Sequence, residues 1–399
     1  MSPNPTEKRN VLLLSSAQAL FQTASVMMMI LSGLVGLKLA ADKSLATLPI
    51  AMMMVAAAAT MIPASMLMQR FGRRAGFMLG TIIGCIAGLI AAAAIWIESF
   101  WLFTFANMLF GGYQAFAQYY RFAAAEAVNT DFRSRAISWV IAGGVVAAFA
   151  APNISKLTQG IGPVPFMASY ISLFVLTLGA LLIVAWLSLP SPSIAVTDGP
   201  KRPLLKIIRQ PLFLTALIGS SVGYAVMIMV MTATPLAMQM HGHSLGASAT
   251  VIQWHVLGMF VPSFFTGHLI HRFGVLQIMA TGTVLLGGHV AIALSGDAYL
   301  YFLSGLTLLG IGWNFLFIGG TTLLTEAYTP SERAKTQAAH DFLMFGAVSI
   351  ASFAAGGLLN LWGWQSVNLI VLPFLVLVLI AIVGLSLSRQ RNRPAGVAD

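Results

Sequence analysis

Long apolar runs separated by short polar connections make up most of the sequence. Each run has about 20 residues or more, the length that an α-helix needs to cross a bilayer. None shows the alternating segments of about ten residues that a closed membrane β-barrel requires. The pattern therefore predicts an all-α membrane protein with twelve transmembrane helices. The twelve runs are 10–37, 46–68, 75–97, 100–124, 135–157, 164–189, 211–235, 246–270, 274–296, 298–325, 335–360 and 363–387.

One basic turn recurs at half the length of the chain. The pattern Leu-x-x-Arg-Phe-Gly occurs at residues 67–72 and again at 269–274. Shorter matches follow at an offset of 200, with Gly112 on Gly312 and Glu126 on Glu326. Such a repeat indicates two copies of one unit. We expect two pseudo-symmetric six-helix bundles, an N-terminal one at residues 1–189 and a C-terminal one at residues 211–399.

A polar connection, residues 190–210, separates the two expected bundles. It holds four prolines between Pro190 and Pro203, and four basic residues. We interpret it as a cytoplasmic linker. Its end, Leu204–Arg209, is compatible with a short amphipathic helix on the membrane surface and equally with an ordinary loop.

Composition and charge agree with a membrane protein. Hydrophobic residues make up 58% of the chain and charged residues 8%, against about 25% charged in a soluble domain. The net charge is +10, but the basic residues lie in short connections, which argues against a nucleic-acid partner. With both termini in the cytoplasm, only Lys38, Lys43 and Lys156 fall in loops on the opposite side. The positive-inside rule then predicts a multi-pass protein of the cell (inner) membrane, both termini cytoplasmic.

Polar residues form stripes on three of the expected helices. In the fourth, Asn107, Gly111, Gln114, Gln118 and Arg121 are spaced 4, 3, 4 and 3 apart, which places them on one face. A polar stripe facing lipid is costly, so we expect a central substrate cavity. The alternative is hydrogen bonding between helices without a substrate. The substrate-binding candidates are Gln18, Gln22, Gln114, Gln118 and Asn314, with Tyr224 and Trp313 as aromatic walls because each lies in a repeated segment.

Acidic residues are scarce in the apolar runs. Glu126 and Glu326 lie near cytoplasmic helix ends, where we expect them to pair with loop arginines as gate contacts; solvated helix ends are the alternative. Asp341 lies about two turns into the eleventh helix. With Arg121 it is the candidate for proton coupling, and the alternative is an ion pair near the interface.

Motifs for enzymatic chemistry are missing from the sequence. The histidines are scattered without metal-ligand spacing, and there is no His-Glu-x-x-His, no phosphate-binding Walker loop and no Gly-x-Ser-x-Gly. We therefore expect no catalytic residue, no metal site and no cofactor, and the chain is not expected to be an enzyme.

The basic turn after the second helix resembles a signature of the major facilitator superfamily, Gly-x-Leu-x-Asp-Arg-x-Gly-Arg-Arg. The twelve spans and the 6+6 division are similar to that family as well. Gln69 stands at the Asp position, and in the second copy His271 does. In the family this loop latches the halves closed on the cytoplasmic side. The resemblance therefore implies gating roles for the matching residues Arg70, Gly72, Arg73, Arg74, Arg272 and Gly274.

Two departures from the family bear on mechanism. The fourth-helix Arg-x-x-x-Gly of proton-coupled members falls on Asn107–Gly111, so the arginine is missing. The fifth-helix Gly-x-x-x-Gly-Pro of antiporters falls on Ala147–Pro152, where both glycines are alanine. These departures disfavour a drug–proton antiporter.

The sequence as a whole predicts a secondary active transporter that works by alternating access and is coupled to an ion. Its partners would be the lipid bilayer, a coupling proton and a small neutral, zwitterionic or amphipathic organic substrate, because the expected cavity offers amides, hydroxyls and aromatic rings. The alternatives are an exporter of drugs or metabolites and, in another class, a membrane sensor on a transporter-like scaffold.

Overall fold

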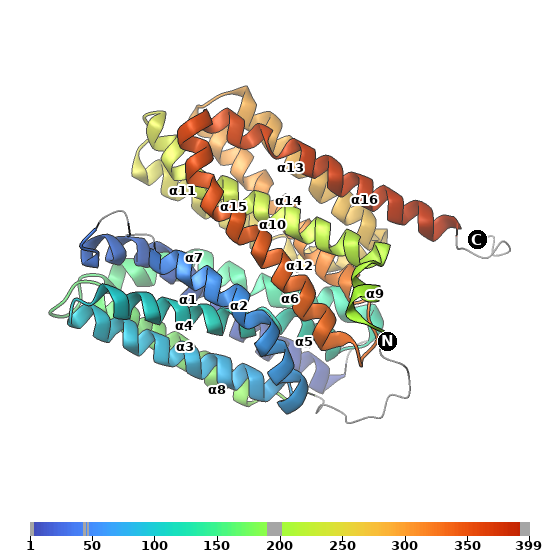
Figure 1. The fold of residues 1–399 in the computed structure, drawn as a ribbon, viewed down its shortest axis with the longest axis horizontal. Helices are drawn as coiled ribbons and strands as arrows, with labels where there is room; N and C mark the ends of the chain where they lie inside the picture. The colour runs from blue at the N-terminus through green and yellow to red at the C-terminus, as the bar shows by residue number, and fades with distance from the viewer. Residues whose placement is uncertain (1–3, 43–44, 46–47, 190–201, 392–399) are drawn as a thin grey trace. The chain divides into compact units, whose positions relative to one another are not determined.

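The computed structural model describes residues 4–42, 45, 48–189 and 202–391 (Figure 1). The contacts divide these residues into two units, and the helix α15 contributes to both of them. Unit 1 holds residues 337–349 of α15 together with α1 (Pro5–Leu39), α2 (Leu48–Phe71), α3 (Arg73–Trp96), α4 (Phe100–Ala117), α5 (Tyr120–Glu126), the 3-10 turn η2 (Thr130–Phe132), α6 (Arg133–Ala142), α7 (Gly144–Thr158) and α8 (Met167–Ala185).

Unit 2 holds the remainder of α15 (Arg333–Leu369) and the other helices from α9 to the end of the described chain. These are α9 (Leu204–Ile208), α10 (Pro211–Met240), α11 (Leu245–Phe260), α12 (Ser263–Phe273), α13 (Val275–Ser295), α14 (Tyr299–Leu324) and α16 (Leu372–Arg391). Residues 190–201 of the expected linker lie outside the described residues. Its described end contains α9, so the amphipathic stretch is helical, with Ile207 buried and Leu205 and Lys206 exposed.

Ten helical stretches of the described chain are long and apolar enough to cross a bilayer. The two other expected spans are interrupted. The run 100–124 forms α4 and α5 with a break at Gln118 and Tyr119, and the run 246–270 forms α11 and α12 with a break at Val261 and Pro262. Pro262 cannot donate a backbone hydrogen bond, which favours a helix end there.

The last expected span, 363–387, falls within an apolar helical stretch at Leu361–Arg391. The end of α15 and the whole of α16, which starts at Leu372, make up this stretch. Gly363 has a φ of 75° and breaks the helical conformation within α15. Pro373 then occupies the first turn of α16, where its missing N–H has no helical partner to lose.

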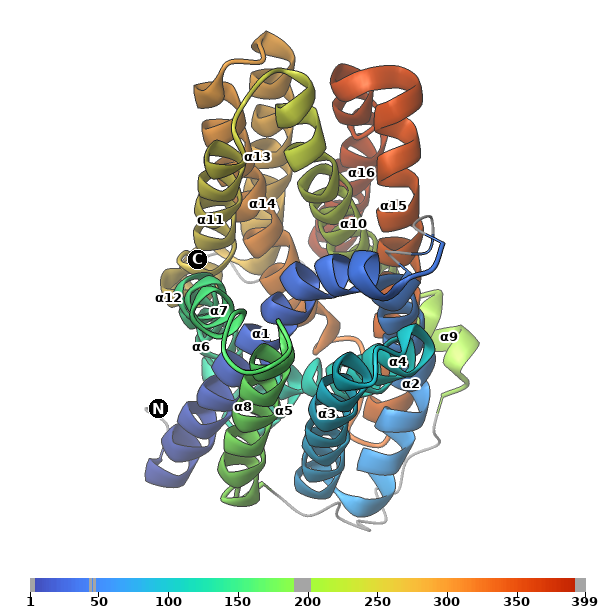
Figure 2. The same ribbon diagram turned by 90° about the vertical axis from the view of Figure 1, so that its left-hand side faces the viewer.

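Each unit is built around one central helix. In unit 1, α4 packs against α1, α2 and α3, and in unit 2, α14 packs against α10, α11 and α13. Figure 2 shows α13 and α14 running alongside each other. The helices α4 and α14 thus occupy matching places in the two repeats, and neighbouring helices bury most of their residues.

Glycines on α3 allow the neighbouring helices to approach closely. A Cβ atom added at Gly80 would lie 2.5 Å from Phe116 Cβ, and one added at Gly84 would lie 2.6 Å from Tyr113 Cδ1. Both contacts are too short for any other residue to be accommodated without movement. The glycines spaced four apart therefore serve helix packing, as is typical of membrane helices.

Two glycines of the repeated basic turn share an unusual backbone conformation. Gly72 has φ 91° and ψ 158°, and Gly274 has φ 92° and ψ 150°. Residues with a Cβ atom rarely adopt this region. Each glycine precedes the helix that follows the turn, so the repeat conserves the geometry of the turn as well as its sequence.

We predict that Gly274→Ala destabilises the protein by about 1–3 kcal/mol because the backbone there is strained for any residue with a side chain. The added methyl group would contact nothing within 4 Å, so strain alone would be measured. Thermal unfolding in detergent tests this. Gly287→Ala is the matched control: it lies inside α13, also with nothing within 4 Å, and should be neutral or stabilising. Equal melting temperatures for the two variants would contradict the prediction.

Candidate functional site

The helices α1 and α4, which carry the expected amide side chains of unit 1, are in contact. The rings of Phe21 and Tyr113 lie 5.3 Å apart in an edge-to-face arrangement, which brings the two helices together. Gln22 follows Phe21, and Gln114 follows Tyr113. Gln18 lies one turn earlier on α1 and donates to Gln22 Oε1 at 3.4 Å. Two of the stripes expected from the sequence therefore lie close together.

Gln114 is the most informative residue of this group. Its side chain is buried, yet its Oε1 atom accepts no hydrogen bond. Buried polar atoms are normally paired, so an unpaired acceptor requires an explanation. Gln118, at the C-terminal end of α4, is half-buried. The unpaired Oε1 of Gln114 could accept from a hydroxyl or N–H group of a bound molecule.

Asn314, at the position that matches Gln114 in the repeat, has a different environment. Its Nδ2 donates to the Met259 carbonyl and to Ser263 Oγ, each at 2.6 Å, and its Oδ1 accepts from Thr266 Oγ1 at 2.7 Å. Both of its N–H groups are thus engaged. Asn314 holds α14 against α11 and α12, which is the alternative that the sequence had left open for such polar stripes.

Aromatic residues in unit 2 surround Trp313. Its ring stacks on Phe317 at 4.8 Å and 13°, and meets Tyr224 and Phe260 edge-on at 5.5 and 5.9 Å. Its Nε1 atom is buried without a hydrogen-bond acceptor. We call Tyr224, Phe260, Trp313 and Phe317 the aromatic cluster. It is a packed group of rings, three of them almost fully buried, that contains one unpaired donor.

The turn after α2 contributes a buried arginine to a polar triangle. Arg73 donates to both oxygens of Glu126, at 2.8 and 3.2 Å, and to Gln337 Oε1 at 2.5 Å. Gln337 in turn donates to Glu126 Oε1 at 3.1 Å. All three residues belong to unit 1, although Gln337 comes from α15. A bidentate arginine–carboxylate pair is both strong and directional.

The other candidates from the basic turns are on the surface. Arg70, Arg74 and Arg272 are exposed. The guanidinium groups of Arg70 and Arg272 lie over Phe71 and Phe273, 5.3 and 5.2 Å from the ring centres. The position that matches Arg73 in the second copy is Val275, so the repeat lacks a second buried arginine. Glu326 is paired with Arg389 at 2.6 Å, and both side chains are exposed.

A fully buried ion pair joins α5 to α15 within unit 1. Arg121 Nη2 lies 2.7 Å from each oxygen of Asp341, and the two side chains are 2% and 0% exposed. His340 Nδ1 lies 2.8 Å from Asp341 Oδ1. The two residues that the sequence nominated for proton coupling are therefore ion-pair partners. Two charges this deeply buried are tolerated only when they are paired and hydrogen-bonded.

Gln337 and His340 were not among the site residues expected from the sequence. Both lie beside Asp341 on α15, where a cluster of polar residues interrupts an otherwise apolar helix. The spacing of Gln337 and Asp341, four residues apart, places them on one helix face. Polar residues at this spacing in an apolar helix could have identified Gln337 from the sequence.

Comparison with known proteins identifies the family. The model of the Major Facilitator Superfamily matches residues 12–252 and 221–398. The chain belongs to the major facilitator superfamily. The all-α, twelve-helix fold predicted from the sequence is thus confirmed, and the protein is a multi-pass membrane transporter, not an enzyme.

Relatives of known description support the same assignment. The riboflavin transporter RfnT of Brucella anthropi is 43% identical over 403 residues, which covers 100% of this chain and 99% of RfnT. YddS of Bacillus subtilis, described as an uncharacterized MFS-type transporter, is 33% identical over 76% of this chain and 72% of its own.

Solved structures share the fold of this transporter. FucP in its outward conformation has a TM-score of 0.78 at 14% identity, covering 94% of this chain and 98% of FucP. The human organic anion transporter MFSD10 has a TM-score of 0.74 at 13% identity, covering 95% and 100%. At such identities the likeness shows the fold alone.

We predict that Asp341→Asn lowers the free energy of unfolding by about 3–5 kcal/mol, because it leaves the buried Arg121 guanidinium without its carboxylate. The double variant with Arg121→Gln should recover part of this loss, since the unpaired charge is gone. Melting temperatures in detergent measure both. Glu326→Gln breaks an exposed pair and should cost at most about 1 kcal/mol. Similar losses for Asp341→Asn and Glu326→Gln would contradict the prediction.

Proposed function

We propose that this transporter moves riboflavin, or a flavin closely related to it, across the cell membrane by alternating access. The observation that carries the proposal is the 43% identity to the riboflavin transporter RfnT over the whole length of both chains. Riboflavin is neutral and amphipathic, with a flat aromatic ring system and a hydroxylated side chain. It therefore falls within the class of solute expected from the sequence.

The aromatic cluster suits the ring of a flavin. Aromatic rings favour offset-stacked and edge-to-face contacts, each worth about 0.5–1.5 kcal/mol beyond the area that they bury. Tyr224 and Trp313 would provide these contacts. The unpaired Nε1–H of Trp313 would donate to a carbonyl oxygen of the ring system, which would remove the cost of burying that donor.

The amides of unit 1 suit the polar parts of a flavin. The unpaired Oε1 of Gln114 would accept from a side-chain hydroxyl or from the imide N–H of the ring. Gln18, Gln22 and Gln118 would complete this polar wall. Asn314, whose donors are engaged within unit 2, would support α14 and would not contact the substrate.

The gating assignment rests on the polar triangle of Arg73, Glu126 and Gln337. By sequence, Gln337 belongs to the second repeat, residues 211–399, yet its contacts lie within unit 1. We infer that this triangle forms and breaks as the repeats, joined by the linker at 190–210, rock about the substrate site. Gly72 and Gly274 would hold the turns in shape. The exposed Arg70, Arg74, Arg272 and Glu326 would lie on the cytoplasmic side, with both termini.

The buried pair of Arg121 and Asp341 supports coupling to protons. Opening this part of unit 1 would separate the pair, and a buried carboxylate without a partner is neutralised most readily by a proton. Asp341 would then carry the proton while Arg121 is displaced.

Riboflavin flux into proteoliposomes tests the substrate. The wild-type protein should move riboflavin, and Trp313→Phe and Gln114→Ala should each weaken binding by roughly fivefold, the equivalent of about 1 kcal/mol for one hydrogen bond. Quenching of riboflavin fluorescence measures the affinity.

Matched controls separate site effects from general ones. Trp186 is 72% exposed and Gln69 is exposed, so Trp186→Phe and Gln69→Ala should bind like the wild type. Binding without flux would indicate a sensor, and neither binding nor flux would refute the proposed substrate. Wild-type affinity in both site variants would remove Trp313 and Gln114 from the site.

An imposed pH gradient tests the coupling. We predict that it accelerates riboflavin flux by the wild-type protein, and that Asp341→Asn abolishes the acceleration while retaining riboflavin–riboflavin exchange, because exchange moves no net proton. Glu326→Gln should respond like the wild type. Flux that is indifferent to the gradient in the wild type would refute proton coupling without refuting riboflavin transport.

A further inference from the structure

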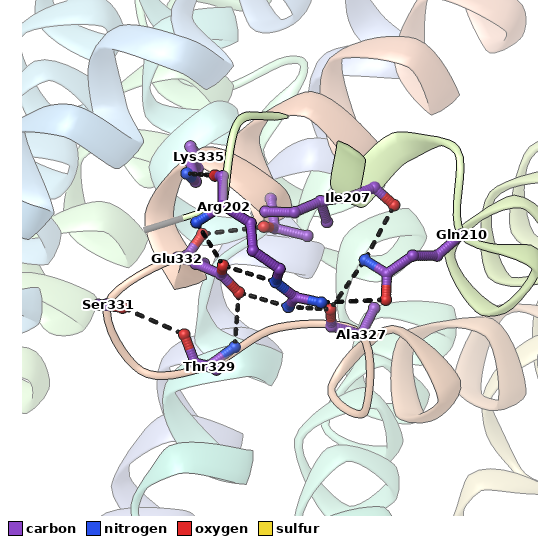
Figure 3. Close-up of polar contacts among 9 residues, drawn as sticks. Arg202, Ile207, Gln210, Ala327, Thr329, Ser331, Glu332 and Lys335 are labelled. Atoms are coloured by element: carbon purple, nitrogen blue, oxygen red, sulfur yellow. Dashed lines mark hydrogen bonds and ion pairs between the residues drawn. The ribbon is translucent and has the colours of Figure 1, made fainter. Parts of the chain in front are cut away.

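A second polar cluster lies at the start of α15, away from the groups assigned to substrate, gating and coupling. It joins the chain just before α9 to the loop between α14 and α15 (Figure 3). We call it the clasp, and its members are Arg202, Gln210, Ala327, Thr329, Glu332 and Lys335. All of them belong to unit 2.

Arg202 and Glu332 form the centre of the clasp. Arg202 Nε lies 2.7 Å from Glu332 Oε1, and Nη2 lies 2.5 Å from Oε2. The backbone N–H groups of Arg202 and Thr329 donate to the same carboxylate at 3.0 and 3.1 Å. The Glu332 side chain is only 2% exposed, against 34% for Arg202. A bidentate pair with two added backbone donors is the strong form of an ion pair.

The remaining contacts connect the clasp to three chain segments. Arg202 Nη2 also donates to the Ala327 carbonyl at 3.2 Å, and Gln210 accepts from Nη1 at 3.3 Å. Lys335, in the first turn of α15, donates to the backbone carbonyl of Arg202. The clasp thus ties the described end of the linker to the first turn of α15.

The clasp remains charged over the physiological pH range. The Arg202 guanidinium, by its hydrogen bond, holds the pKa of the Glu332 carboxyl well below its usual range. The ion pair therefore stabilises the fold fully above the pKa of about 4.3 that Glu332 has in the unfolded chain. This stabilisation is lost only as the pH falls toward the lower pKa of Glu332 in the folded protein. This excludes the clasp as a sensor of neutral pH.

The clasp lies at the start of α15, directly before the stretch of this helix that belongs to unit 1. Glu332 immediately precedes the helix, and its carbonyl accepts from Thr336 Oγ1 at 2.9 Å. Gln337, the residue after Thr336, is the first residue of α15 that belongs to unit 1. At 1.5 Å per residue, Asp341 lies about 13 Å along the helix from Glu332. Gln337 and Asp341 therefore lie on the helix that starts at the clasp, within about three turns of it.

The corresponding loop of the first repeat is closed by different contacts. At an offset of 200, Phe132 occupies the position of Glu332. There Asn129 Oδ1 accepts from the Phe132 N–H at 3.1 Å. The bidentate pair of Arg202 and Glu332 is therefore not a copy of this local contact.

We propose that Arg202 and Glu332 are positioning residues for gating: they fix the first turn of α15 to the end of the linker, so that α15 moves as one body and carries Gln337 and Asp341 to and from Arg73 and Arg121. The proposal rests on the transport function above, but it places neither residue in contact with substrate. Without the clasp, the first turn of α15 would move independently of the linker. The contacts that Gln337 and Asp341 make would then no longer form and break together.

Transport kinetics test this role. Arg202→Ala and Glu332→Gln should each lower kcat for riboflavin by about tenfold, equivalent to about 1.4 kcal/mol, with KM and riboflavin affinity within twofold of the wild type. The reversed pair, Arg202→Glu with Glu332→Arg, should recover part of the kcat. Arg209→Ala, an exposed arginine just after α9, is the control and should leave kcat unchanged.

The other outcomes would overturn the proposal. A lower melting temperature with unchanged kcat would mean that the clasp only stabilises unit 2. A rise in KM matching the fall in kcat would mean that it acts on the substrate site.

Hydrogen exchange gives a readout that needs no substrate. Arg202→Ala should accelerate backbone exchange in residues 333–341, and Arg209→Ala should not. Faster exchange confined to residues 202–210 would refute the proposal. If the wild-type protein fails to move riboflavin while exchange at 333–341 responds as expected, the substrate assignment fails and the positioning role stands.

Discussion

Charge is scarce in the helices of this transporter, and pairing of the few buried charges constrains the rest of unit 1. Arg121 and Asp341 are almost completely buried and 2.7 Å apart. A lone charge among apolar helices would be far more costly than the pair, so α5 and this part of α15 must remain together while both groups are charged. A transport cycle that separates them requires a replacement partner or a proton.

The two repeats share backbone geometry but differ in side-chain chemistry. Gly72 and Gly274 have nearly the same dihedral angles, and α4 and α14 occupy matching central places. In contrast, Arg73 corresponds to Val275, and the unpaired Gln114 corresponds to the saturated Asn314. Duplication therefore accounts for the shared scaffold, whereas these buried polar side chains differ between the repeats.

Much of the fold follows from the sequence because the bilayer imposes a simple rule. Helices must be about 20 apolar residues long, so hydrophobic runs located most spans. Interruptions inside the spans were not visible. The break at Gln118 and Tyr119 depends on contacts that a hydropathy pattern does not encode. The kink at Gly363, in contrast, lies at the expected boundary between the last two spans.

Polar stripes show which residues avoid lipid, but not whether their hydrogen bonds are used internally. From the sequence, Gln114 and Asn314 were both expected to bind the substrate, since both are amides in matching positions. Asn314 is saturated by Met259, Ser263 and Thr266, residues that lie about 50 positions away in the chain. Pairings over such separations, like that of Arg121 with Asp341, arise only when the helices pack.

The distribution of polar contacts along α15 shows how one helix can serve both stability and transport. Its first turn is tied to unit 2 by a charged clasp with many donors, whereas Gln337 and Asp341 make their contacts within unit 1. Glu332 stays ionised at neutral pH because Arg202 stabilises its charge, while Asp341 is fully buried beside Arg121. The same helix therefore carries two ion pairs with different partners, one at its start and one further along its length. The first ties α15 to the end of the linker, and the second ties it to α5.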